Sequence, residues 1–510
     1  MQKKYLVGVD LGTSATKAAI YQIDGTLVAE SMIEVPLVHP KPGVVEQNND
    51  DFYTTAARSV KRCIDSSGIN PSEIVSIAFD SQMAGVGLVN EDFKPVSHFD
   101  SWLDMRCQPF IEWMDKDAGE RITQLTGCPP TCDHGPKMLW WKHEHPDLYN
   151  QTAKFIMPGT YVAIRASSLK TEDTFIDHTY IHFSGFSDAK NGSWSKELCD
   201  QFGLDIEKLP KIVDPCDIVG ELSENAAREF GLQPGTPIAA GAGDTAANAL
   251  GAGIVRNGML FDVAGTASVL AGCTNQYVAD TSNRALLTMR SVIPGLWHPL
   301  AYIGGGGLAL RWFRDQFFNT NCGSLNQNSE EIYDKMLSMA ENINPGSDGL
   351  FFSPHLGGRI CPSNPAMRGA WIGASWSHTQ AHFSRAILES VAYEYAYYLK
   401  ILKSLIPDLE LIQARVIGGG ARSRFWNQIK ADILNVPTQK LNGSEFGTWG
   451  SAMIAGKAVG AIKDLSSHAE NTAVLSGNAC EPGKANHEVY KPLIEKYISL
   501  QRLLNEFYSA

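Results

Sequence analysis

The chain has 510 residues, of which 44% are hydrophobic and 19% are charged, and it carries a net charge of −12. This length exceeds what one hydrophobic core usually supports, so two domains are expected, over residues 1–253 and 254–510. The negative charge argues against a nucleic acid or an anionic membrane as a partner, because either requires a basic face.

The apolar run at the N-terminus is too short for an export signal, and no uncharged apolar stretch reaches the length of a membrane span. A cytoplasmic location is therefore expected, with the 10 cysteines reduced. A homodimer is compatible with the sequence, which does not determine the oligomeric state.

The N-terminal segment predicts a three-stranded meander, with strands at Tyr5–Asp10, Ala18–Tyr21 and Leu27–Glu30. The glycine turn Gly12-Thr13-Ser14 joins the first two strands, and Asp24-Gly25 is a strong turn signal before the third. Rossmann and Walker loops lead directly into a helix, so this glycine turn is of another kind. A helix over about 50–64 and a strand over 74–79 follow, and this alternation favours an α/β layer fold.

The pattern of the N-terminus recurs near the midpoint of the chain. The apolar Met259–Phe261 leads to Gly265-Thr266, so a strand again ends in a Gly-Thr turn. This repeat suggests an internal duplication, although two unrelated strand ends that share one dipeptide would look the same. Two further glycine loops, Gly304–Gly307 and Gly418–Gly420, each follow an apolar run and precede a helical pattern.

Glycine turns of this kind allow backbone amides to approach a phosphate closely. Two of the four turns are hairpins and two lead from a strand into a helix, a set that fits a nucleotide lying between two domains. The chain has no Gly-x-x-x-x-Gly-Lys-Ser/Thr sequence, which excludes a Walker P-loop.

Two aspartates at turns are candidate functional residues. Asp10 ends the first strand, where a carboxylate can hold a hydrated magnesium ion beside phosphates or can cap the turn. Asp244 follows the apolar Pro237–Ala240 and three small residues, at the point where a helix begins. There it can be the base that phosphoryl transfer to an alcohol requires, or a helix N-cap, and the two roles are compatible.

The segment from Trp102 to Arg106 combines an aromatic ring, a carboxylate and a guanidinium. Such a set suits a polyol, because the ring packs on carbon-bound hydrogens while the charged groups bond to hydroxyls. The alternative is an ion pair between Asp104 and Arg106 in a surface loop.

In the second half, a long helix is expected to begin near Thr379. Its apolar stripe is interpreted as core, and consists of Phe383, Ile387, Leu388, Val391, Tyr395, Tyr398 and Leu402. Residues 319–330 are polar and predict a loop, and the tail beyond Glu481 predicts a terminal helix.

Taken in order, these motifs resemble those of the FGGY carbohydrate kinases over about Tyr5 to Ala461, and within that family they are most similar to the xylulose kinases. The matching stretches are Gly8–Ser14, Gln82-Met83, Trp102–Arg106, Pro136–Trp140, Gly241–Asp244, Gly265-Thr266, Arg385–Glu389 and Gly418–Ser423. The resemblance implies an α/β fold of two actin-like ATPase (ribonuclease H-like) domains that close over a ligand cleft. It implies ATP and Mg²⁺ as co-substrates and a small sugar as acceptor, with D-xylulose as the first choice.

The resemblance also implies roles for individual residues. Asp244 would be the catalytic base, and Asp10 would hold magnesium through water. The acceptor would be bound by Gln82, Met83, Ala84, Trp102, Asp104, Arg106 and Asp244. The nucleotide would be bound by Gly12, Thr13, Ser14, Lys17, Gly265, Thr266, Gly307, Gly419 and Gly420.

Some positions depart from the family pattern. Xylulose kinases usually carry His after the Gln-Met pair, where this chain has Ala84, so an imidazole that can bond a sugar hydroxyl is missing. The stretches Gly357–Pro362 and Glu389-Ser390 also differ. These departures leave another sugar, a polyol or a sugar-like signal open as the acceptor. A nucleotide-switched binding protein on the same scaffold, or a sugar sensor without catalysis, would explain fewer of the motifs.

Overall fold

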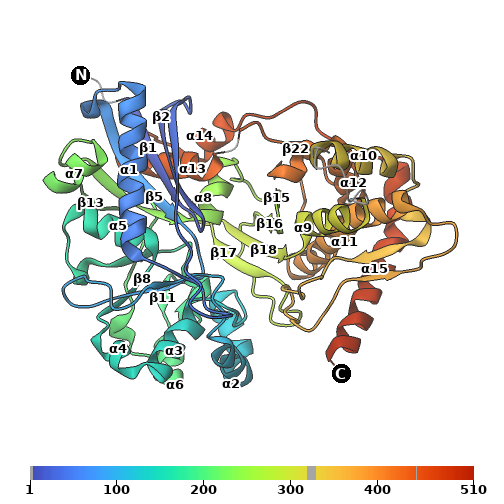
Figure 1. Cartoon of the computed structure of the whole chain (residues 1–510), viewed down its shortest axis with the longest axis horizontal. Coiled ribbons are helices and arrows are strands. Elements are labelled where there is room, and N and C mark those ends of the chain that lie inside the picture. The colour runs from blue at the N-terminus through green and yellow to red at the C-terminus, as the bar shows by residue number, and fades with distance from the viewer. Residues whose placement is uncertain (1–3, 319–328, 444, 510) are drawn as a thin grey trace, which may run out of the picture.

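The computed structural model describes residues 4–318, 329–443 and 445–509. Each half of the molecule contains one six-stranded sheet with helices packed on it (Figure 1). The first sheet has the order β13 (Ile218–Glu221), β14 (Pro237–Gly243), β5 (Ile74–Ser81), β1 (Tyr5–Leu11), β2 (Ala15–Gln22) and β3 (Leu27–Glu34). The second has the order β17 (Leu287–Arg290), β18 (Trp297–Ile303), β16 (Ser268–Gly272), β15 (Met259–Ala264), β21 (Gln413–Ile417) and β22 (Thr438–Lys440).

Five strands of each sheet share one topology, and the sixth strand lies at opposite edges. In the first, β1, β2 and β3 form an antiparallel meander, and β5 and β14 continue the sheet in parallel with β1. In the second, β15, β16 and β18 form the meander, and β21 and β22 continue it in parallel with β15. The Gly-Thr turns occupy equivalent hairpins, so the predicted duplication is confirmed at the level of topology.

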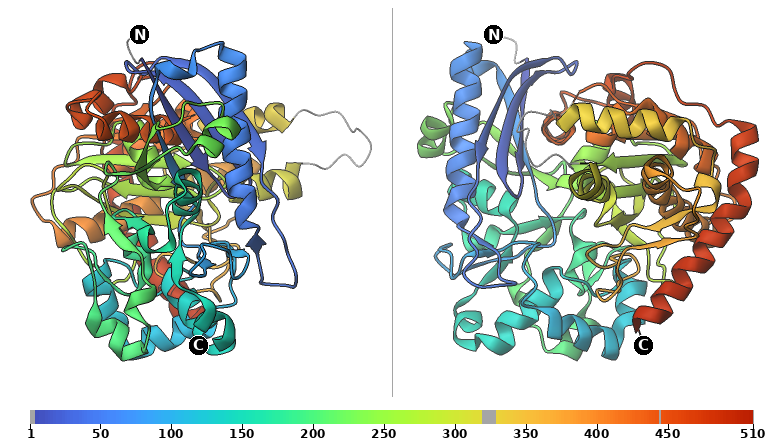
Figure 2. Two further views of the ribbon diagram at one scale, coloured as in Figure 1. Left: turned by 90° about the vertical axis from the view of Figure 1, so that its left-hand side faces the viewer. Right: turned by 45° about the vertical axis from the view of Figure 1, so that its right-hand side comes forward.

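The predicted helices are present, with ends that local capping explains. α1 (Asn49–Ser67) begins after Asn48, whose side chain accepts a hydrogen bond from the Asp50 amide, and ends at Gly68 with a left-handed φ of 66°. α11 (Gln380–Leu405) begins after Thr379, and its expected stripe is buried or half-buried in the second half. α15 (Lys484–Ser509) is the terminal helix and runs along the outside of that half (Figure 2).

One helix of the second half packs on the first sheet. α13 (Phe446–Ala458) lies against β1, β5 and α8 (Asp244–Gly251). Glycines allow backbone to meet backbone here: a Cβ on Gly8 would lie 1.8 Å from the Thr448 carbonyl oxygen, and one on Gly450 would lie 2.0 Å from that of Ala247. The predicted boundary at 253/254 thus separates the two sheets, whereas α13 lies across it.

The predicted loop at 319–330 falls mostly outside the described residues, and its last two residues begin α10 (Ser329–Glu341) instead. Within the three described ranges, no helix has the length and apolarity needed to cross a membrane.

Candidate active site

Three aspartates meet at one edge of the first sheet. β14, β5 and β1 are neighbouring parallel strands, so their carboxyl ends lie at the same edge. Asp10 of β1 is paired in register with Asp80 of β5, and Asp244 directly follows β14. Two of these residues were predicted as site residues from the sequence.

Asp80 was not predicted. It is fully buried, and its Oδ2 accepts a hydrogen bond of 2.6 Å from the Ser451 hydroxyl of α13, while its Oδ1 has no partner. Its position after a buried strand was visible in the sequence, as it was for Asp10. Only the pairing of β5 with β1 shows that both carboxylates belong to one site.

Burial and mutual repulsion shape the electrostatics of this edge. Burial, followed by the charge of Asp244, raises the pKa of Asp10 to about 7, although nearby Lys17 opposes the shift. Burial and the charge of Asp10 raise the pKa of Asp80 well above its usual value. Burial also raises the pKa of Asp244 to about 6, against the hydrogen bonds from Thr245. Crowded carboxylates of this kind attract a cation.

Asp244 is the first residue of α8, and Gly243 occupies the N-cap position, so the N-cap alternative is wrong. The Asp244 Oδ1 accepts hydrogen bonds from the amide and hydroxyl of Thr245, at 2.6 and 3.1 Å. Gly241 has a φ of +82°, and a Cβ there would lie 1.8 Å from the Phe79 carbonyl oxygen. Only glycine therefore lets β14 approach β5 closely enough to carry Asp244 to this edge.

The predicted acceptor residues Gln82 and Trp102 are both connected to the first glycine turn. Gln82 is buried, and its Nε2 donates to the Gln47 Oε1 at 2.7 Å, while its own Oε1 has no partner. Gln47 in turn donates to the Thr13 carbonyl oxygen at 2.9 Å. The Trp102 indole donates to the Thr13 hydroxyl at 2.8 Å, and 43% of Trp102 is exposed.

Met83 and Ala84 follow Gln82. The Met83 thioether packs against Gly243, where a Cβ would lie 2.6 Å from the sulfur. Ala84 has a left-handed φ of 60° and its carbonyl oxygen accepts a hydrogen bond of 3.1 Å from the buried amine of Lys137. Lys137 thus fixes the backbone of the predicted acceptor loop.

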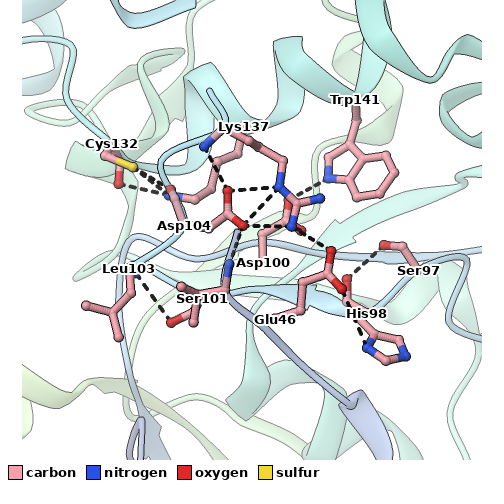
Figure 3. Close-up of polar contacts among 12 residues, drawn as sticks. Glu46, Ser97, His98, Asp100, Ser101, Leu103, Asp104, Cys132, Lys137 and Trp141 are labelled. Carbon is pink, nitrogen blue, oxygen red and sulfur yellow. Dashed lines mark hydrogen bonds and ion pairs between the residues drawn. The ribbon is translucent and has the colours of Figure 1, made fainter. Parts of the chain in front are cut away.

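Asp104 and Arg106 form the ion pair that was the alternative interpretation of this loop, but Asp104 is fully buried and only 10% of the Arg106 side chain is exposed. Figure 3 shows Asp104 close to Asp100 and Lys137. Arg106 donates from Nε to both Asp104 oxygens at 2.9 Å and from Nη2 to Glu46 at 2.6 Å. Asp104 Oδ2 also accepts from the Val45 amide at 2.8 Å. These bonds occupy both carboxylate oxygens of Asp104 and two guanidinium nitrogens of Arg106. The bonds of this pair support the segment that carries Trp102, and contact of the pair with the acceptor stays a prediction.

Five of the nine predicted nucleotide contacts line one pocket of about 680 Å³ in the second half. They are Gly265, Thr266, Gly307, Gly419 and Gly420. The amides of Gly307 and Leu308 donate to the carbonyl oxygens of Gly265 and Thr266, at 3.1 and 2.9 Å, so two glycine loops are locked together. Further walls come from Tyr333 of α10 and from Trp426 of α12 (Arg424–Leu434), neither of which was predicted.

The other four predicted contacts, Gly12, Thr13, Ser14 and Lys17, belong to the β1–β2 hairpin and do not line this pocket. Lys17 pairs in register with Asp10 and lies 3.2 Å from the Glu445 carboxylate, just before α13. The hairpin therefore places a cation beside the aspartates.

Comparison with known proteins identifies the class. Residues 5–251 and 261–459 match the N-terminal and C-terminal domains of the FGGY family of carbohydrate kinases. A xylulose kinase of Staphylococcus epidermidis is 28% identical over 506 residues, covering 98% of this chain and 97% of that protein. A gluconokinase of Bacillus subtilis is 27% identical over 515 residues, covering 99% and 97%.

The xylulose kinase structure from Lactobacillus acidophilus superposes with a TM-score of 0.90 at 23% identity, covering 99% of each chain. The predicted two-domain actin-like fold is thereby confirmed. The fold and the two family matches show that the chain is a carbohydrate kinase. The chain belongs to the FGGY family of carbohydrate kinases.

Proposed function

We propose that this enzyme transfers the γ-phosphate of ATP to a hydroxyl of a small ketose, with D-xylulose converted to D-xylulose 5-phosphate as the first choice. The observation that carries the proposal is the position of Asp244. Asp244 follows the strand end that pairs with β5 just before Gln82 and Met83, and its charge acts on Asp10 at the end of β1. The pKa of its carboxyl group is raised to about 6, near that of an effective general base.

In the proposed reaction, Asp244 accepts the proton of the acceptor hydroxyl as its oxygen bonds to the γ-phosphorus. The bond from that phosphorus to the bridging oxygen breaks, and ADP leaves. Amides of the Gly12 and Gly265 turns hold the phosphates, and the pocket at Gly419 holds the nucleoside. Trp102 packs on the acceptor and is held in place through Thr13.

Asp10 and Asp80 fit a magnesium ion. Asp80 has a buried oxygen without a partner, and both carboxylates have pKa values raised by burial and by neighbouring charge. Within the described residues no group of three or more His, Cys, Asp or Glu is placed to hold a metal ion, so phosphate and water oxygens would have to complete the coordination. Bound magnesium would neutralise charge on the transferred phosphoryl group.

The acceptor is tested by ADP release with ATP, magnesium and a panel of ketoses, polyols and sugar acids. We expect D-xylulose to stimulate release most. Ala84→His should raise kcat/KM for D-xylulose by about threefold to tenfold, because one hydrogen bond is added. Ala84→Gly is the control, since it keeps the left-handed backbone without a polar group. If a sugar acid such as gluconate is preferred, the xylulose assignment fails; if no compound stimulates release, the kinase proposal fails.

The nucleotide pocket is tested at Gly419, where a Cβ meets no atom within 4 Å. Gly419→Leu should leave the fold intact and raise the KM for ATP by about tenfold or more, because the side chain enters the pocket. Gly357→Leu is the matched control, since Gly357 is equally open but does not line the pocket. An unchanged KM for ATP in Gly419→Leu would place the nucleotide elsewhere.

A further inference from the structure

Two thiols lie in contact beneath the proposed acceptor loop. Cys107 directly precedes α2 (Gln108–Thr126) and is fully buried, and Cys132 precedes α3 (His134–Glu144) and is partly exposed. Their sulfur atoms are 3.6 Å apart, although 25 positions separate them in the chain. Both are free thiols, and the proposed phosphoryl transfer uses neither.

A buried lysine completes this cluster. The Lys137 Nζ lies 3.3 Å from the Cys132 sulfur and donates to the carbonyl oxygens of Cys132 and Ala84, at 2.9 and 3.1 Å. In the thiol form, Cys132 donates to the Asp104 carbonyl oxygen at 2.7 Å (Figure 3). One sulfur therefore touches the predicted acceptor segment and the amine that fixes Ala84.

The two thiols differ in acidity. The hydrogen bond from Cys107 and the charge of Lys137 lower the pKa of Cys132 to about 6, although burial opposes the shift. The same hydrogen bond, together with burial, raises the pKa of Cys107 far above its usual value. A partly exposed, more acidic thiol thus lies 3.6 Å from a buried, less acidic one, which is the arrangement of an attacking and a resolving cysteine.

We propose that Cys107 and Cys132 are a reversible oxidative modification site, at which a hydroperoxide converts the two thiols to a disulfide. The Cys132 thiolate attacks one peroxide oxygen, the O–O bond breaks, and a sulfenic acid and a hydroxide or alkoxide form. The Cys107 sulfur then attacks the sulfenic sulfur, the S–O bond breaks, and water leaves with the Cys107 proton. The two cysteines lose two electrons, the peroxide gains them, and a dithiol reverses the reaction.

The modification should also slow phosphorylation, an effect that rests on the proposed function. The sulfurs must approach from 3.6 Å to about 2.05 Å. The disulfide removes the anion beside Lys137 and displaces Cys132, so the amine that fixes Ala84 is repositioned. A displacement of about 1 Å in a substrate-binding loop costs 10- to 100-fold in rate.

The full-length enzyme is treated with hydrogen peroxide, blocked with N-ethylmaleimide and mapped by mass spectrometry. We expect a peptide cross-linked between Cys107 and Cys132 that dithiothreitol removes. Cys107→Ser should stop at a sulfenic acid on Cys132 that dimedone traps, and Cys132→Ser should form neither product. Cys216→Ser is the control, because Cys216 is also partly exposed and should leave the cross-link unchanged.

Peroxide should lower kcat/KM for the active acceptor by about 10- to 100-fold in the wild type and in Cys216→Ser, but not in Cys132→Ser relative to its untreated form. Absence of the cross-linked peptide from oxidised wild type would overturn the proposal, whatever the activity. If the cross-link forms while no acceptor is phosphorylated under any condition, the modification site stands and the proposed function fails.

Discussion

Replacing Asp244 by Asn should lower kcat for the active acceptor by about 10²- to 10⁴-fold, the usual contribution of a general base. The amide keeps the shape of the side chain but cannot accept the hydroxyl proton. Affinity for ATP should be nearly unchanged, because Asp244 does not line the nucleotide pocket. Steady-state kinetics and ATP titration measure the two quantities.

The matched control is Asp65→Asn, which removes a carboxylate that is 60% exposed on α1 and pairs only with Lys61 in its helix. It should leave kcat within about twofold, since exposed ion pairs contribute little. Retention of more than about a tenth of wild-type turnover by Asp244→Asn would reject the assigned role.

The pH dependence follows from the same carboxylate. Burial raises the pKa of Asp244 to about 6, so below that pH the group is protonated and cannot act as a base. At saturating magnesium, kcat/KM should rise tenfold per pH unit below about pH 6 and level off above it. An acid limb with its midpoint at the ordinary aspartate pKa, near 4, would show that another group controls the rate.

Replacing Glu394 by Gln should lower the free energy of unfolding by about 3–5 kcal/mol, because it leaves a buried charge without its partner. Glu394 of α11 is fully buried and accepts hydrogen bonds from Arg359, His355 and Tyr497, at 3.0, 3.2 and 3.0 Å. Tyr497 belongs to α15, so one carboxylate connects α11, the 355–362 segment and the terminal helix. Thermal or urea unfolding of the second half measures the loss.

Glu495→Gln is the control for this substitution. Its pair with Lys400 is exposed, at 61% and 53% of the side chains, and should cost less than about 1 kcal/mol. Burial alone would raise the pKa of Glu394, but Arg359 and His355 lower it to about 2. The stabilisation of the fold by the Glu394 carboxylate is therefore complete above about pH 4.5 and is lost as the pH falls from there toward 2. Equal losses in the two variants would contradict the buried-network assignment.

The stretch Gly357–Pro362 contributes one residue to this network. Arg359 of that stretch is buried and bonds to Glu394.

Turn chemistry and hydrophobic periodicity were sufficient for the β1–β2–β3 meander, for α1 and for the core face of α11. They were sufficient because backbone preference and side-chain spacing act within a few residues. The glycine loops were also predicted, since a Gly-rich turn after a strand is a local signal. That five residues of these loops would line one pocket depended on the second sheet, which brings Gly265, Gly307 and Gly419 together.

Asp244 was found from the sequence because small residues, a strand end and the family motif surround it. Asp80 was not, because its role depends on which strand lies next to β1, and strand pairing is a long-range property. The Asp104–Arg106 pair shows the same limit, since only the tertiary structure shows that the Val45 amide and Glu46 bind this pair. The candidate residue types for the chemistry were thus determined by the sequence alone. Which carboxylates share a site was decided by the tertiary structure, because parallel strands far apart in the chain end at one edge.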